Sequence, residues 1–104
     1  MSRNQIKFSE DSEKTANFLK ALAHPIRLEI IRCLQEGPKC VFEIEEHVGT
    51  TQSNISQHLA VMKNKGILQA SRDGNQIRYS VFNWRIFQFL AKARDLLTTV
   101  PGSS

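Results

Sequence analysis

The sequence predicts a mainly helical fold with one small β-hairpin, in the order α-α-α-α-β-β-α. Three observations predict it. Glycines follow patterned stretches at Gly37, Gly49, Gly66 and Gly74, and helices commonly end at glycine. Apolar residues recur at helical spacing in most of these stretches, but alternate with polar ones after Gly74. A length of 104 residues fits one domain, expected over 1–104 with flexible tails at 1–10 and 100–104.

Three helices are expected in the first half of the chain. The first covers about 11–23 because three apolar residues recur there at helical spacing. These are Phe18, Leu19 and Leu22. The dipeptide His24-Pro25 ends it, since proline suits the first turn of the following helix. The second helix then covers about 26–36, and a short third one about 41–48.

A fourth helix, from Thr51-Gln52 to about Lys65, has one apolar and one polar side. The apolar side predicts contact with the core, through Ile55, Leu59 and Met62. The opposite side has short or amide side chains and no carboxylate. Its residues are Ser53, Gln57, Ala60 and Asn64.

Two strands follow, over 68–72 and 76–82, with the hairpin sequence Asp73-Gly74-Asn75 between them. Two helices joined by a short turn and followed by such a hairpin form a helix-turn-helix with a wing. The predicted architecture is therefore a winged helix-turn-helix domain.

The last helix, about 84–99, has an apolar stripe that covers about half of its circumference, more than a small core requires. Ile86, Leu90, Ala93, Leu97 and Val100 follow one another along it, and Phe87, Phe89 and Leu96 widen it. We expect something other than this domain's own core to cover that face.

Positive charge is concentrated where the fourth helix and the hairpin lie. The formal net charge is +4, but residues 51–82 alone have +3, from Lys63, Lys65, Arg72 and Arg78 against Asp73. A helix that enters the major groove of DNA needs short or amide side chains, and carboxylates are repelled by phosphates. The composition therefore indicates binding to double-stranded DNA.

The residues expected to contact DNA come from the fourth helix and the hairpin. They are Gln52, Ser53, Asn54, Ser56, Gln57, His58, Lys63, Arg72, Gln76 and Arg78. Gln57 is the expected base contact, and the cations are expected near the phosphates. His58 lies closest to the core edge, so packing or hydrogen bonding inside the protein is its alternative role.

Three motifs, in order, resemble the ArsR/SmtB family of small bacterial winged-helix repressors. They are Leu22-Ala-His-Pro-Ile-Arg-Leu-Glu-Ile-Ile, Ser53-Asn-Ile-Ser-Gln-His-Leu-Ala-Val-Met-Lys-Asn-Lys-Gly-Ile-Leu and Gln76-Ile-Arg-Tyr-Ser-Val. The resemblance implies a homodimer formed by the first and last helices, and a palindromic operator. The interface residues expected on this basis are Phe18, Leu19, Leu22, Ile86, Phe87, Phe89, Leu90, Ala93 and Leu97.

The family often senses metals, but this sequence departs from its metal-site patterns. The family's Cys-x-Cys at the start of the third helix corresponds to Cys40-Val41-Phe42, so one thiolate is missing. Residues 84–100 have no His and one carboxylate, Asp95, which removes the family's other common site. We expect no bound metal or other cofactor, and a metal or metalloid bound through Cys40 is the alternative.

The two cysteines suggest a different sensing chemistry. Cys40 is expected at a helix N-terminus, where thiolates are favoured. Our hypothesis is that Cys40, alone or with Cys33, senses an oxidant, a sulfur species or a trivalent metalloid. The alternatives are that Cys33 is a small core residue and that Cys40 is a relic of a lost metal site.

Other classes of protein are less consistent with the sequence. Motifs of hydrolases, phosphate-binding loops and zinc proteases are absent, so we expect no enzyme. No apolar run is long enough to span a membrane, and two cysteines with no signal peptide favour the cytoplasm. A winged helix that binds proteins instead of DNA is the remaining alternative.

Overall fold

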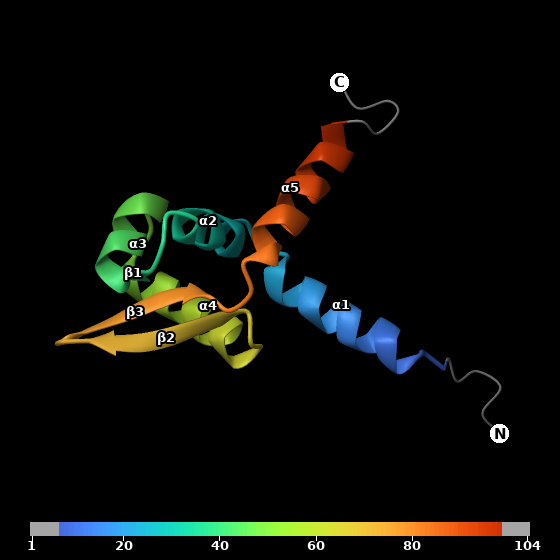
Figure 1. Ribbon diagram of the computed structural model, residues 1–104, viewed down its shortest axis with the longest axis horizontal. Coiled ribbons are helices and arrows are strands. Elements are labelled where there is room, and N and C mark those ends of the chain that lie inside the picture. Colours follow the sequence, from blue (N-terminus) through green and yellow to red (C-terminus); the bar gives the residue numbers. More distant parts are fainter. Residues whose placement is uncertain (1–6, 99–104) are drawn as a thin grey trace.

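The computed structural model describes residues 7–98 (Figure 1). Its elements in chain order are α1 (Glu10–Leu22), α2 (Pro25–Leu34), β1 (Lys39–Cys40), α3 (Val41–Val48), α4 (Gln52–Asn64), β2 (Leu68–Asp73), β3 (Gln76–Val81) and α5 (Arg85–Thr98). All seven predicted elements are present, and their ends lie within about two residues of the expected positions. The tails predicted at 1–10 and 100–104 lie mostly outside the described residues, as does Val100.

The structure adds one element, the strand β1, to the predicted order. This two-residue strand pairs antiparallel with β3, which places Lys39 opposite Tyr79 and Cys40 opposite Arg78. The sheet order is β1-β3-β2, all antiparallel. A two-residue strand has no sequence period, so only its tertiary pairing defines it. The wing therefore has a direct backbone connection to the start of α3.

Local sequence signals define where the helices begin and end. The hydroxyl of Ser9 accepts the Ser12 N–H at 3.0 Å, which identifies the N-cap of α1. His24 caps α2, with its Nδ1 accepting the Ile26 N–H at 3.1 Å and Pro25 at the first helical position. Gly49 ends α3 in the left-handed conformation, with φ 83°.

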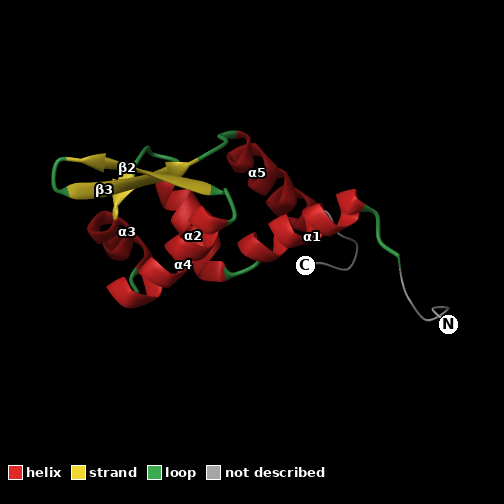
Figure 2. Ribbon diagram, turned by 90° about the horizontal axis from the view of Figure 1, so that it is seen from below, coloured by secondary structure: helices red, strands yellow, loops and turns green. Residues whose placement is uncertain are grey.

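The core lies between α2, α3 and α4 and under the sheet (Figure 2). Its fully buried side chains include Ile30, Ile31, Ile44, Ile55, Leu59 and Met62. The apolar side predicted for α4 is confirmed. This packing fixes the outward face of α4, because its opposite face is held in the core.

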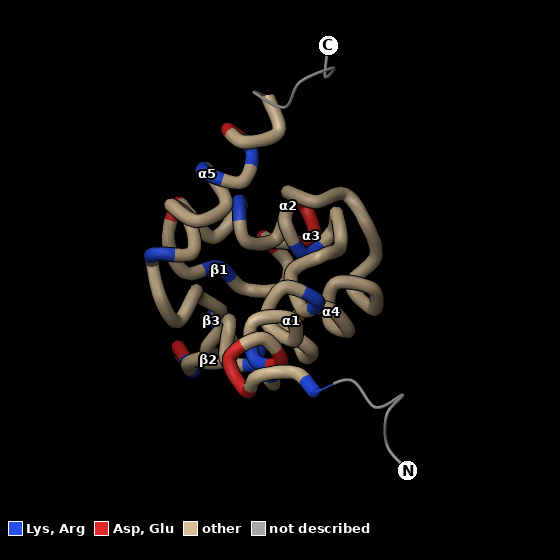
Figure 3. The backbone as a smooth tube through the Cα atoms, turned by 90° about the vertical axis from the view of Figure 1, so that its right-hand side faces the viewer, with Lys and Arg blue, Asp and Glu red and all other residues tan. Residues whose placement is uncertain are grey.

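The two terminal helices project from this core, at the end of the molecule opposite the hairpin (Figure 1). The radius of gyration is 16.6 Å, against about 13 Å for a compact chain of this length. Along α5 only Ile86 is buried. Acidic residues occupy the first turn of α1 and basic residues recur along α5 (Figure 3).

The expected interface residues divide into two groups. Leu22 and Ile86 are buried in the chain's own core, so their assignment to an intermolecular interface was wrong. Phe18, Leu19, Phe89 and Leu97 keep 40%, 44%, 42% and 67% of their surface exposed. Ala93 is exposed, and Phe87 and Leu90 are partly buried against the core. No helix within residues 7–98 is long and apolar enough to cross a membrane.

Candidate nucleic-acid interface

The outward face of α4 is a row of exposed polar side chains. These are Gln52, Ser53, Ser56, Gln57, Lys63 and Asn64, with the small Ala60 among them. The helix starts at Thr51, whose hydroxyl accepts the Asn54 N–H at 3.2 Å. Asn54 also donates from Nδ2 to the Thr50 hydroxyl at 3.1 Å. This second bond ties Asn54 to the turn before α4, a role that its helical position did not indicate.

Three cations near this row have no carboxylate partner in the described part of the chain. Lys63, Lys65 and Arg72 are exposed, and none forms an ion pair with a residue between 7 and 98. Gln76 is also exposed, at the wing tip opposite Asp73. Cations that have no internal partner are available to neutralise phosphates. The +3 charge of the segment is thus a surface property of α4 and the wing.

Arg78 is partly exposed and contacts two carboxylates of the protein. Its Nε donates to Asp73 at 3.0 Å, and its Nη1 lies 3.4 Å from Glu43 Oε1. The hydrogen bond that Arg78 donates to Asp73, together with the charges of both carboxylates, raises the pKa of Arg78. The Arg78 guanidinium thus joins the wing to α3, and its contact with a DNA phosphate stays a prediction.

Glu43 extends this connection to Cys40. The Cys40 N–H donates to Glu43 Oε1 at 3.0 Å, on the same oxygen that Arg78 approaches. Hydrogen bonds from the backbone and the thiol of Cys40 hold the pKa of Glu43 below its ordinary value, and the Arg78 charge adds to the effect. Cys40, Glu43, Arg78 and Asp73 thus form a polar chain from the start of α3 to the wing.

His58 is buried, so its prediction as a DNA contact was wrong and its alternative role is the one observed. Its Nδ1 accepts a hydrogen bond from Arg27 Nε at 3.0 Å, and Arg27 Nη1 donates to the Ala21 carbonyl at 3.0 Å. The rings of His58 and His24 lie 4.4 Å apart. This cluster links α4 to the junction of α1 and α2. It thereby helps to orient the outward face of α4, although His58 itself does not lie on that face.

Burial lowers the pKa of His58, and the nearby charges of His24 and Arg27 lower it further. A histidine that takes up its proton more readily in the unfolded chain destabilises the fold as the pH falls below about 6.5. We expect the free energy of unfolding, from urea titrations at about pH 7.5 and about pH 5.5, to decrease at the lower pH. His58→Asn, which keeps an acceptor for Arg27, should reduce this decrease. Equal pH dependence in the wild type and in His58→Asn would contradict the assignment.

Both cysteines are free and buried, with 2% of Cys33 and 8% of Cys40 exposed. Burial raises the pKa of the Cys33 thiol, so Cys33 is a core residue with little thiolate character. Cys40 is the N-cap residue of α3, as predicted. Within residues 7–98 no three His, Cys, Asp or Glu side chains are grouped as metal ligands would be.

Known proteins resemble this chain in sequence and in fold. A family model described as "Bacterial regulatory protein, arsR family" matches residues 24–70, from His24 to the first half of β2. The transcriptional regulator Rv0081 of Mycobacterium tuberculosis is 42% identical over 86 residues, which cover 82% of this chain and 75% of the relative. The probable mercury resistance operon repressor of Streptomyces lividans is 34% identical, over 86% and 80% of the two chains. The crystal structure of Rv0081 superimposes with a TM-score of 0.79 at 38% identity, over 88% of this chain and 92% of that one.

Proposed function

Since the chain belongs to the ArsR family of bacterial regulatory proteins, and is thus a DNA-binding transcriptional regulator and not an enzyme, we propose that it is a dimeric repressor of a palindromic operator. We further propose that α4 of each copy enters the major groove and that the wing contacts the adjacent backbone. A regulator that binds bacterial operators works where the DNA is, so we propose the cytoplasm as its compartment.

The observation that carries this proposal is the surface of α4. Its exposed row is polar and free of carboxylates, and three cations without a carboxylate partner among residues 7–98 flank it. Amide and hydroxyl groups can read base edges, while Lys and Arg neutralise phosphates. In a winged helix that binds proteins instead of DNA, we would expect an apolar or acidic row at the same place.

The dimer is supported by the apolar surface of α1 and α5. Phe18 and Phe89 approach each other from the two helices, with ring centroids 6.0 Å apart, and both stay about 40% exposed. Leu96 and Leu97 add two side chains that are each 67% exposed. Such a surface on a small soluble domain indicates an interface. A two-fold dimer would present two α4 helices about one DNA turn apart.

Salt dependence of binding to random duplex DNA tests the proposal. Lys63, Lys65 and Arg72 from two copies supply six cations, so the slope of log affinity against log salt should be about −5. Affinity should then fall about a thousandfold between about 50 and about 200 mM salt. The measurement is a fluorescence anisotropy titration at several salt concentrations. Absence of binding at the lowest salt concentration would instead favour the protein-binding alternative.

For the effector, we propose that a small thiol-reactive species acts at Cys40, with no resident metal or cofactor. The supporting observation is the contact of Cys40 with Glu43, which in turn holds Arg78 of the wing. A peroxide would convert the thiol to a sulfenic acid and release water. The added oxygen would disturb the Glu43 contact, and with it the Arg78 contact that joins the wing to α3.

Operator affinity before and after peroxide treatment tests this role of Cys40. We expect the affinity of the wild type to fall at least about threefold, and that of Cys40→Ser to stay constant. Cys33→Ser is the matched control: it removes the other thiol and should respond like the wild type. If wild type and Cys40→Ser respond alike, Cys40 is not the sensor.

A further inference from the structure

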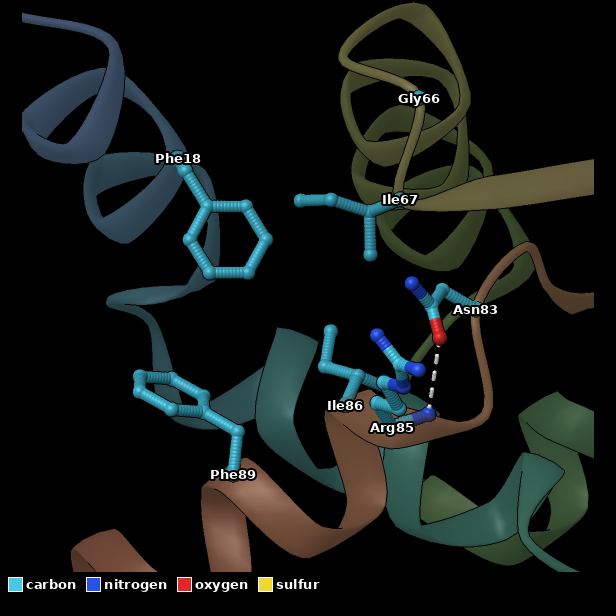
Figure 4. Close-up of a pocket in the computed structure, with 7 residues that line it drawn as sticks. All are labelled: Phe18, Gly66, Ile67, Asn83, Arg85, Ile86 and Phe89. Atoms are coloured by element: carbon cyan, nitrogen blue, oxygen red, sulfur yellow. Dashed lines mark hydrogen bonds between the residues drawn. The ribbon is translucent and has the colours of Figure 1, made fainter. Parts of the chain in front are cut away.

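A pocket of 270 Å³ lies between the terminal helices and the DNA-binding part of the chain (Figure 4). Phe18 of α1 and Phe89 of α5 line one side of it. Gly66 and Ile67, in the turn from α4 into β2, line another. Asn83, Arg85 and Ile86 complete it, where β3 leads into α5. Its volume is just below the range of drug-sized ligand sites, so it suits a small molecule.

The walls of the pocket combine aromatic and aliphatic groups with one cationic edge. Phe18, Ile67, Ile86 and Phe89 supply an apolar lining in which a planar ring can pack. The polar groups, Asn83 and Arg85, lie together on the side away from the two phenylalanine rings (Figure 4). A ligand that matches both sides has an apolar body and one anionic end.

The two polar groups are available to such a ligand. Asn83 Oδ1 accepts the Arg85 backbone N–H at 3.0 Å, which fixes the amide and leaves its NH₂ group to donate. The Arg85 guanidinium forms no ion pair and no side-chain hydrogen bond with the rest of residues 7–98. Arginine recognises carboxylates through two parallel N–H donors, and an adjacent amide can add a third.

We propose that this pocket binds a small aromatic carboxylate that regulates DNA binding. The ring packs between Phe18, Ile67 and Phe89, and the carboxylate pairs with Arg85 and the Asn83 amide. The regulatory part rests on the function proposed above. Both connections of the wing, at Ile67 and at Asn83, border the pocket, and their backbones are joined through the Phe82 N–H, which donates to the Ile67 carbonyl at 2.9 Å. A ligand wedged there changes the angle between α5 and the wing.

Phenylacetate and its neutral analogue phenylacetamide are the probes that test the site. Trp84 is the chain's one tryptophan and adjoins two pocket residues in sequence, so its fluorescence is a first signal to follow, and calorimetry is the decisive measurement. On the full-length protein without DNA, we expect saturable phenylacetate binding and at least about tenfold weaker binding of phenylacetamide. Calorimetry should give the same ratio.

Arg85→Gln should weaken phenylacetate binding at least about tenfold and leave phenylacetamide binding unchanged. Arg94→Gln is the matched control: it removes the same charge from the same helix, outside the pocket lining, and should bind phenylacetate like the wild type. Equal affinities for acid and amide, or equal losses in the two variants, would overturn the site. Absence of saturable binding would also overturn it and would be expected if a side chain of a second copy fills the pocket.

The effect of the ligand on DNA binding is measured in a separate experiment. Operator affinity with saturating phenylacetate should differ at least about threefold from that without it, in the wild type but not in Arg85→Gln. An unchanged operator affinity in a protein that binds phenylacetate would overturn the regulation. Because ligand binding is measured without DNA, failure of the site and failure of the proposed DNA-binding function give different results.

Discussion

Leu97→Glu should convert the dimer to a monomer and lower affinity for the operator at least about a hundredfold. Leu97 is 67% exposed on α5, so the substitution leaves the core of the domain intact. In the dimer, however, the same side chain would be covered, and an unpaired carboxylate in an apolar interface is strongly unfavourable. Loss of the second half-site contact costs about two to four orders of magnitude in affinity.

Analytical ultracentrifugation and operator titration measure the two halves of this prediction. Gln88→Glu is the control, because it places the same charge on an exposed polar position of the same helix. The control should stay dimeric and bind the operator within about twofold of the wild type. A dimeric Leu97→Glu protein would contradict the interface assigned to α5.

Gln57→Ala should reduce discrimination between operator and random DNA. Gln57 is exposed at the centre of the row on α4, and a bidentate amide contact to a base supplies about 1–3 kcal/mol of discrimination. Operator affinity should therefore fall about tenfold or more, while affinity for random duplex stays within about twofold.

Arg72→Ala provides the contrast for Gln57→Ala. Arg72 is exposed on β2 without an ion-pair partner within residues 7–98, so its expected contact is a phosphate. Its loss should weaken binding to operator and random DNA by the same factor, with a shallower salt slope. If Gln57→Ala also weakened both equally, Gln57 would have no role in base recognition.

The sequence was sufficient to predict the helices, the hairpin and the outward face of α4. Local signals carried these predictions: His24-Pro25 at the start of α2, Gly49 after α3, and Asp73-Gly74 at the wing tip. The apolar side of α4 faces the core as its period indicated, and this alone fixes which residues face outward.

Contacts between distant residues were not predictable in this way. Arg78 was predicted as a phosphate contact because it is a cation in the hairpin. Glu43, whose carboxylate partly neutralises it, lies 35 positions earlier in the chain. His58 lies at the boundary between the two faces of α4, and its hydrogen bond from Arg27 of α2 joins residues 31 positions apart, which the spacing along α4 does not reveal. Leu22 and Ile86 belong to apolar stripes of which one part packs in the core and the other part stays exposed. Periodicity alone does not show which residues of a stripe belong to which part.

Hydroxyl-radical footprinting on a selected operator tests the central claim most directly. The account predicts two protected regions on one face of the duplex, with centres about 10 base pairs apart, corresponding to two α4 helices in successive major grooves. Leu97→Glu and Gln57→Ala should weaken both regions together. A single protected region, or uniform protection without preference for the operator, would contradict a two-fold dimer that reads sequence through α4.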